Sequence, residues 1–180
     1  MKKLSHEEIK ESKPSIEETQ KKERSNFYLL LDNIRSLYNV GAIFRTSDAV
    51  LVKKVFLTGI TGSPPRKEIT KTALGAEELV PWEYHEEAVE VIKKLKADGV
   101  KIVAVELAHE AKHYLEADYD FPVCFVLGHE VEGISDEVME LVDLSIYLPM
   151  LGRANSLNVA TCYGIIVYDA LNKLNGKKKK

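Results

Sequence analysis

The sequence predicts a single α/β domain built on a parallel β-sheet and preceded by a short helical extension. Between residues 26 and 175, short apolar segments typical of strands alternate with segments of helical spacing, a pattern that favours parallel strands joined by helical crossovers. Several strand segments are apolar at every position, as strands are when helices cover both faces of a sheet. With 180 residues, 45% of them hydrophobic, the chain can bury the core that such a domain needs.

Each predicted strand is a short run of aliphatic and aromatic residues bounded by polar or turn-forming residues. FYLLL, for example, ends at Asp32-Asn33, and KKVFLTG runs into a loop rich in glycine and proline. A shorter extended piece is expected at VPWEY. The five main strands are expected at 27–31, 53–59, 101–107, 122–128 and 144–150.

The segments between the strands are expected to form helices because their apolar residues recur at helical spacing. NVGAIFRTSDAVL can be capped by its first residue, Asn39. EEAVEVIKKLKADG is amphipathic and ends at a glycine, which is a common helix stop. The helices are expected at 5–24, 39–51, 67–74, 86–99, 136–142 and 158–174.

Charge is distributed unevenly along the chain, whose net charge is −3. Of the 25 basic and 28 acidic residues, residues 1–25 hold seven and six, and residues 173–180 hold five and none, which leaves 13 and 22 between them. Phosphate binding must therefore be local rather than driven by the field of the whole domain. We expect a charged helical extension over 1–25, the α/β domain over 26–175 and a basic tail over 176–180.

The composition also bears on the cellular compartment. The N-terminal residues lack the apolar core of a signal peptide, and no apolar stretch is long enough to cross a bilayer. Cys124 and Cys162 lie in apolar runs, which favours buried thiols over a disulfide. We therefore expect a soluble, cytoplasmic protein without membrane contacts.

Polar or glycine-rich loops follow four of the predicted strands, at the edge where open α/β sheets bind their ligands. These loops are DNIRSLYNVGAIFR, ELAHE, LGHEVEG and MLGRANSLN. Neither a P-loop nor a glycine-rich dinucleotide-binding motif occurs, so the sequence disfavours both classes of nucleotide-binding enzyme.

HEAKH (109–113) matches the zinc-hydrolase pattern H-E-x-x-H, in which one helical face presents two histidines. A third ligand would be needed, and Glu130 and Glu132 are within plausible sequence range. Both glutamates, however, lie beside glycines directly after a strand, and 109–118 lacks the apolar face of a core helix. An exposed helical turn is the favoured interpretation, with a zinc hydrolase as the alternative.

Three blocks of the sequence together are similar to a known family. NIRSLYNVGAIFRTSDA (33–49), CFVLGHEVEGIS (124–135) and IYLPMLGRANSLNVATCYGIIVYDA (146–170) resemble, in order and spacing, the three signature motifs of the SpoU/TrmH family. These proteins are RNA ribose 2′-O-methyltransferases of the SPOUT class. The resemblance implies a C-terminal trefoil knot, S-adenosylmethionine as methyl donor, and a homodimer with its active site near the subunit interface.

The resemblance also implies the substrate class. The expected reaction is methyl transfer to a ribose 2′-hydroxyl of structured RNA. The short extension and the basic tail favour tRNA, with rRNA as the alternative and a catalytically silent RNA-binding member as the third possibility. The 2′-hydroxyl is the group that distinguishes RNA from DNA.

By similarity, the catalytic residues are Arg45, Asn39, Glu130, Ser156 and Asn158. Arg45 is the central one, and two roles are open for it. It can act as the base that takes the 2′ proton, as is proposed for the family, although a guanidinium stays protonated in proteins. It can instead bind the adjacent phosphate and stabilise the developing alkoxide.

The donor pocket is expected to be largely backbone with apolar walls, and the resemblance places Gly128, Leu148, Leu157, Leu127 and Glu106 in it. No metal site is assigned. Two positions depart from the family: His129, where relatives often have asparagine or serine, and Ala160, where they commonly have serine. Exposed cations near the strand ends are candidates for contacts with RNA phosphates. They are Arg35, Arg66, Lys67, Lys71 and Arg153.

Overall fold

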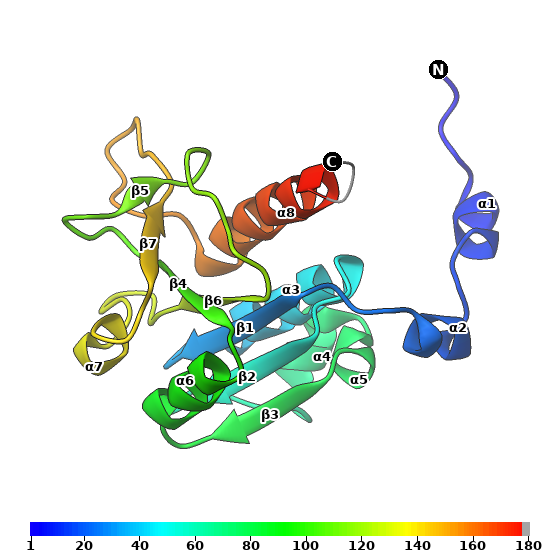
Figure 1. Cartoon of the computed structure of the whole chain (residues 1–180). Helices are drawn as coiled ribbons and strands as arrows, with labels where there is room; N and C mark the ends of the chain where they lie inside the picture. Colours follow the sequence, from blue (N-terminus) through cyan, green and yellow to red (C-terminus); the bar gives the residue numbers. More distant parts are fainter. Residues whose placement is uncertain (178–180) are drawn as a thin grey trace.

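The protein forms a seven-stranded parallel sheet with helices on both faces (Figure 1). The structure, a computed structural model, describes residues 1–177 of the chain. The strand order is β3-β2-β1-β6-β4-β7-β5. The strands are β1 (Phe27–Asp32), β2 (Lys54–Thr58), β3 (Trp82–His85), β4 (Lys101–Val105), β5 (Lys112–His113), β6 (Val123–Leu127) and β7 (Leu144–Tyr147).

Eight helices occur within residues 1–177. Two form the N-terminal extension, four of the others (α3, α4, α5 and α8) pack on one face of the sheet, and α6 and α7 pack on the opposite face. The helices are α1 (His6–Glu11), α2 (Ile16–Lys21), α3 (Leu37–Ala49), α4 (Lys67–Ala73), α5 (Ala76–Leu79), α6 (Ala88–Ala97), α7 (Asp136–Met139) and α8 (Val159–Lys177).

The inner strand β1 shows why the strand residues before Asp32 are all apolar. Phe27, Leu29 and Leu31 are buried against the layer of α3 and α8, whereas Leu30 is buried on the other face with Ile92 of α6. Successive side chains of a strand point to opposite faces, so a strand covered on both sides has no solvent-facing position. The predicted parallel sheet, covered on both faces, is confirmed.

Most predicted element boundaries lie within three residues of the observed ones. The short helix α5 and the two-residue strand β5 were not predicted, since neither has enough residues to show a period. α8 continues to Lys177, through the first two residues of the predicted basic tail. The remainder of that tail, 178–180, lies outside the described residues.

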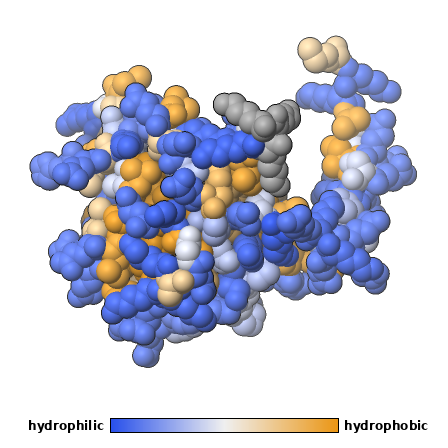
Figure 2. Space-filling view, in the orientation of Figure 1, coloured by the Kyte–Doolittle hydropathy of each residue, from blue (hydrophilic) through white to orange (hydrophobic). Residues whose placement is uncertain are grey.

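The N-terminal extension is two short helices rather than the single helix predicted over 5–24. Pro14 cannot donate a backbone hydrogen bond and disfavours helical geometry at the preceding residue, so the chain breaks between α1 and α2. Ser5 and Ser15 each begin a helix with a complete capping box. Helix α1 stands apart from the domain, whereas α2 contacts α5 (Figure 1). Figure 2 shows apolar side chains among the hydrophilic ones of the extension; Leu4, Ile9 and Ile16 are exposed there.

Helix α3 begins two residues before the predicted start, and Ser36, not Asn39, is its N-cap. Ser36 Oγ accepts a hydrogen bond from Asn39 N–H at 3.4 Å. The prediction was wrong because both residue types cap helices well and the sequence offers both within four positions. Since Ser36 fills the cap position, the Asn39 side chain is available for other contacts.

Both interpretations of the HEAKH segment required a helix, but the segment is not helical. His109 and Glu110 lie in a turn, and Lys112 and His113 form β5, which pairs with β7. The expected helical turn is therefore wrong, because pairing with β7 supplies the backbone hydrogen bonds that a helix would otherwise provide. His113 Nδ1 accepts a hydrogen bond from Leu115 N–H at 3.3 Å.

The two cysteines are free thiols, Cys124 buried and Cys162 partly buried, as the sequence predicts. Burial raises the pKa of Cys162 to about 11, so the thiol is protonated at neutral pH. Over residues 1–177, no helix combines the length and the apolar character that a membrane crossing needs.

The path of the C-terminal third is unusual. β7, the last strand, lies between β4 and β5, which precede it in the chain and are joined by residues 106–111. The segment that follows β5 returns past α8 to enter β6 in the middle of the sheet (Figure 1). This insertion of a late strand between two earlier ones is compatible with the expected trefoil knot, which stays a prediction.

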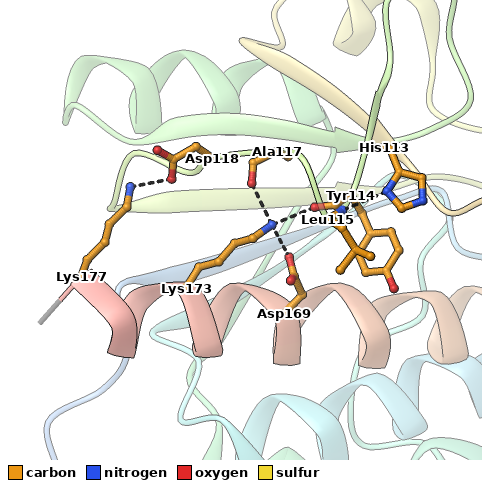
Figure 3. Close-up of polar contacts among 8 residues, drawn as sticks. All are labelled: His113, Tyr114, Leu115, Ala117, Asp118, Asp169, Lys173 and Lys177. Carbon is orange, nitrogen blue, oxygen red and sulfur yellow. Dashed lines mark hydrogen bonds and ion pairs between the residues drawn. The ribbon is translucent and has the colours of Figure 1, made fainter. Parts of the chain in front are cut away.

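Two lysines fasten the end of α8 to the segment that joins β5 to β6 (Figure 3). Lys173 Nζ donates to the carbonyl oxygens of Tyr114 at 2.8 Å and Ala117 at 2.7 Å, and it pairs with Asp169 at 2.7 Å. Lys177 Nζ donates to the carbonyl oxygen of Tyr119. The contacts thus join lysine side chains of α8 to backbone carbonyl groups of the segment. Any sequence would provide the carbonyl groups, whereas the lysines are particular to this sequence.

We expect Lys173→Met to lower the free energy of unfolding by about 1–3 kcal/mol, because two backbone carbonyls and the Asp169 carboxylate lose their cationic partner. Lys177→Met is the matched control: its side chain is 45% exposed against 20% for Lys173, so its loss should stay below about 1 kcal/mol. Urea denaturation at pH 7 measures both. Equal losses would contradict the assignment of Lys173 as the main contact.

Candidate active site

A cavity of about 860 Å³ lies at the carboxyl ends of β4, β6 and β7. Its walls come from the residues that follow these strands and from the first turn of α8. All five residues predicted for the methyl donor line it, as do three of the predicted catalytic residues. The first set is Glu106, Leu127, Gly128, Leu148 and Leu157, and the second is Glu130, Ser156 and Asn158.

One wall of the cavity is a tight turn after β6, residues 128–134. His129 and Gly133 exchange two backbone hydrogen bonds of 2.9 Å, and Gly133 has a positive φ of 76°. A Cβ atom on Gly128 would lie 2.2 Å from the carbonyl carbon of Gly133. Glycine at 128 is therefore required by the close approach of the turn's two ends, independently of any ligand.

His129, which received no role in the sequence analysis, holds the turn from within. Its Nδ1 accepts hydrogen bonds from the backbone N–H groups of Val131 at 3.2 Å and Glu132 at 3.1 Å. An acceptor at Nδ1 requires the proton of the neutral ring to sit on Nε2. The side chain at position 129 therefore supports the turn that carries Glu130.

Glu130 projects from this turn onto the start of α3. Its carboxylate accepts hydrogen bonds from the backbone N–H groups of Arg35 at 3.0 Å and Ser36 at 3.1 Å, and from Asn39 Nδ2 at 2.8 Å. Partial burial raises the pKa of the Glu130 carboxyl, but the hydrogen bonds from these groups outweigh it and leave the pKa below its ordinary value. Glu130 is therefore an ionised acceptor at neutral pH.

Asn39 and Asn158 extend this contact to the last helix. Asn158 Nδ2 donates to Asn39 Oδ1 at 3.0 Å, while Asn158 Oδ1 accepts from the N–H groups of Ala160 at 3.0 Å and Thr161 at 3.2 Å. Asn158 thus caps α8 and contacts α3 at the same time. Ala160 contributes only its backbone N–H to the cap, so the cap does not depend on the side chain at position 160.

Arg45 is not placed with these residues. It is exposed on α3 and is not among the residues that line the cavity. Six positions along an α-helix correspond to a rotation of about 240° from Asn39, so the two side chains leave the helix in different directions. Ser156, in contrast, is exposed at the cavity wall.

Four of the predicted RNA-binding cations are exposed on adjoining elements: Arg35 precedes α3, Arg66 and Lys67 begin α4, and Lys71 lies within α4. α3 and α4 pack so closely that a Cβ on Gly41 would lie 2.1 Å from Thr72 Oγ1. The fifth cation, Arg153, is exposed on the separate loop between β7 and α8.

No group of three metal-ligating side chains (His, Cys, Asp or Glu) lies close enough together within residues 1–177 to hold an ion. The histidines of HEAKH occupy a turn and a strand, so the helical face that a zinc hydrolase needs does not form.

Replacing Glu130 by Gln should lower the free energy of unfolding by about 1–2 kcal/mol at pH 7, since three donors lose an ionised acceptor. Because the pKa of Glu130 is depressed in the folded protein, this contribution is complete above the pKa of the unfolded chain and is lost as the pH falls through the folded pKa. Urea denaturation between pH 7 and pH 3 should show the difference shrinking. Exposed Glu132→Gln serves as the control; a difference that does not depend on pH would contradict the ionised state.

Comparison with known proteins identifies the family. The model of the "SpoU rRNA Methylase family" matches residues 26–168. The tRNA (guanosine(18)-2′-O)-methyltransferase of Thermus thermophilus is 33% identical over 155 residues, covering 86% of this chain and 79% of the relative. The enzyme of the same name from Aquifex aeolicus is 34% identical over 157 residues, covering 86% of this chain and 73% of its own.

Solved structures agree with this match. The A. aeolicus TrmH/SpoU tRNA modifying enzyme superposes with a TM-score of 0.81 at 32% identity, covering 91% of this chain and 82% of that one. The AdoMet-bound rRNA methyltransferase of Sinorhizobium meliloti gives 0.79 at 30% identity, covering 87% and 60%. The family match over residues 26–168, together with a cavity where the motif residues meet, shows that the chain belongs to the SpoU methylase family of RNA methyltransferases.

Proposed function

We propose that the protein transfers a methyl group from S-adenosylmethionine to a ribose 2′-hydroxyl of tRNA. The observation that carries the proposal is the hydrogen-bond chain from Glu130 through Asn39 to Asn158, which joins one residue from each signature block beside a single cavity. The relatives named as tRNA 2′-O-methyltransferases support tRNA as the substrate. A tRNA substrate agrees with a cytoplasmic location. Methylation of rRNA is the second candidate, favoured by the rRNA methyltransferase among the similar structures.

The cavity suits S-adenosylmethionine in size and in the chemistry of its walls. Its volume of about 860 Å³ lies within the usual range for sites of small ligands. Leu127, Leu148 and Leu157 offer apolar surface for an adenine ring, and the turn at Gly128 brings backbone groups close to it. When bound, the donor supplies an electrophilic methyl group; Glu106 and the backbone around the cavity would hold it.

We favour an electrostatic role for Arg45. A guanidinium stays protonated in proteins, so it binds phosphate and stabilises a developing alkoxide more readily than it accepts a proton. Ser156 at the cavity wall lies where it can contact the ribose. Glu130, Asn39 and Asn158 then keep α3 and α8 in fixed positions relative to each other.

The same proposal accounts for the exposed cations. Arg35, Arg66, Lys67 and Lys71 would bind phosphates of the RNA along the α3–α4 side of the sheet edge, and Arg153 would do so from the opposite loop. Such contacts are local, as the acidic composition of the domain requires.

We infer further that the active unit is a homodimer. Arg45 is exposed on α3, which packs against α8, and α8 exposes Ile165 and Tyr168 at 37% and 53%. A second copy seated on this layer would cover apolar surface, and Arg45 would then lie at the interface. Tyr168→Glu should convert the dimer to a monomer in sedimentation velocity; an unchanged dimer would place the interface elsewhere.

The reaction is tested by incubating the protein with methyl-labelled S-adenosylmethionine and separate pools of unmodified tRNA and rRNA. Label in tRNA, mapped by nuclease digestion and mass spectrometry to one ribose, is the expected result. Label in rRNA alone would move the substrate to the second candidate. The absence of label from both pools would favour a catalytically silent RNA-binding protein.

Arg45→Ala should reduce kcat by about 100-fold or more, while the dissociation constant for S-adenosylmethionine stays within about twofold, because Arg45 does not line the cavity. Arg45→Lys, which keeps the charge without the bidentate geometry, should recover only part of the rate. Steady-state kinetics and calorimetric titration of the donor measure the two effects. Near-normal turnover by Arg45→Ala would contradict both roles considered for this residue.

A further inference from the structure

Asp32, at the carboxyl end of β1, is a buried acid that does not line the cavity. It is 2% exposed, and its carboxylate accepts three hydrogen bonds. Oδ2 accepts from Ser135 N–H at 2.9 Å and from Ser135 Oγ at 2.8 Å, and Oδ1 accepts from Asn33 Nδ2 at 2.9 Å. Burying a carboxylate without such donors would cost free energy, so these hydrogen bonds fix the side chain in this position.

The partner of Asp32 is Ser135, which directly follows the turn that carries Glu130. The near end of that turn is fixed by β6, whose last residue, Leu127, pairs with Leu31 directly before Asp32. The far end, at Ser135, lies outside the sheet and begins α7. Asp32 therefore ties the free end of the turn to the strand beside which it started.

A second carboxylate acts on the same stretch from the other side. Glu106 follows β4, the other neighbour of β6, and its Oε2 accepts from Ile134 N–H at 3.1 Å. The consecutive amides of Ile134 and Ser135 are thus held by carboxylates from the two strands that flank β6. Between these anchors the turn presents Glu130 to α3 and its backbone to the cavity.

We propose that Asp32 is a positioning residue for methyl transfer, acting through Ser135 to set where the Glu130 turn stands relative to the donor cavity and α3. This inference rests on the proposed function. Displacement of the turn would widen the cavity wall at Gly128 and Val131 and would draw Glu130 away from Asn39. A shift of about 1 Å in such groups is enough to cost a large factor in rate.

Asp32→Asn and Ser135→Ala test the proposal, with Asp143→Asn as the matched control. Asp143 likewise holds a backbone amide, that of Ile102 at 2.8 Å, but at the amino end of β4, on the edge of the sheet away from the cavity. All three variants should melt at lower temperature than the wild type. Only the first two should change binding and catalysis.

We expect Asp32→Asn to raise the dissociation constant for S-adenosylmethionine about tenfold and to lower kcat about tenfold, with the KM for RNA within about twofold of the wild type. Ser135→Ala, which keeps the backbone hydrogen bond, should raise that dissociation constant about threefold. Asp143→Asn should leave all three parameters within about twofold. Calorimetric titration and steady-state kinetics are carried out at least 15 °C below the lowest melting temperature of the set, roughly the margin that keeps every variant folded.

Donor binding and turnover by Asp32→Asn equal to those of the wild type would overturn the positioning role and leave the proposed function untouched. Equal losses in Asp143→Asn would overturn it as well, since they would show a general effect of destabilisation. Failure of the wild-type protein itself to bind S-adenosylmethionine would instead overturn the proposed function, and the positioning role with it.

Discussion

The contact between the Glu130 carboxylate and the start of α3 is the interaction on which the rest of the site depends. It joins a turn after the central strand β6 to two backbone amides and one side-chain amide of a different crossover. Both carboxylate oxygens are free to accept, and neither donates, when the group is ionised, and the lowered pKa of Glu130 keeps it ionised at neutral pH. Because the Asn39 amide is oriented by Glu130, its carbonyl oxygen is left to receive Asn158.

Helix α8 continues this set of contacts beyond Asn158. The helix is capped at the cavity by Asn158 and fastened at its other end by Lys173 and Lys177 to the segment after β5. β5 itself pairs with β7, and the residues after β7 form the cavity wall that leads into α8. Each end of α8 is therefore held by a part of the chain that is distant in sequence. Its first turn is held by α3, and its last turns are held by the segment that follows β5.

The fold could be predicted to a large extent from the sequence, because a parallel sheet covered on both faces leaves continuous apolar runs such as FYLLL and VCFVL. What could not be predicted depends on tertiary contacts. The strand at Lys112–His113 exists only because β7 is there to pair with it. The start of α3 was misplaced because local capping propensity cannot choose between Ser36 and Asn39.

For the site, the predicted donor residues lie along one cavity, since the carboxyl ends of parallel strands meet at one edge. Asp32, Ser135 and His129 were not predicted as contributors. Their side chains act on backbone amides of a turn, and no periodicity or spacing in the sequence signals that kind of contact. The strand end at Asp32-Asn33 offered one signal, a carboxylate directly after a fully apolar run, but the same residues are equally suited to a simple turn.

The geometry also separates the residues that hold the site from those able to react. Glu130 already accepts three hydrogen bonds, and the amides of Asn39 and Asn158 each use both their donor and their acceptor within this chain of contacts. Engaging any of them in proton transfer would break the bridge between α3 and α8. Ser156 and Arg45 are exposed and take no part in the hydrogen bonds of this bridge. Under the proposed function, Glu130, Asn39 and Asn158 would support the reaction, and Ser156 and Arg45 would contact the RNA. Arg45 does not line the cavity of its own chain, so the role proposed for it requires that bound RNA or a second copy bring it to the reacting ribose.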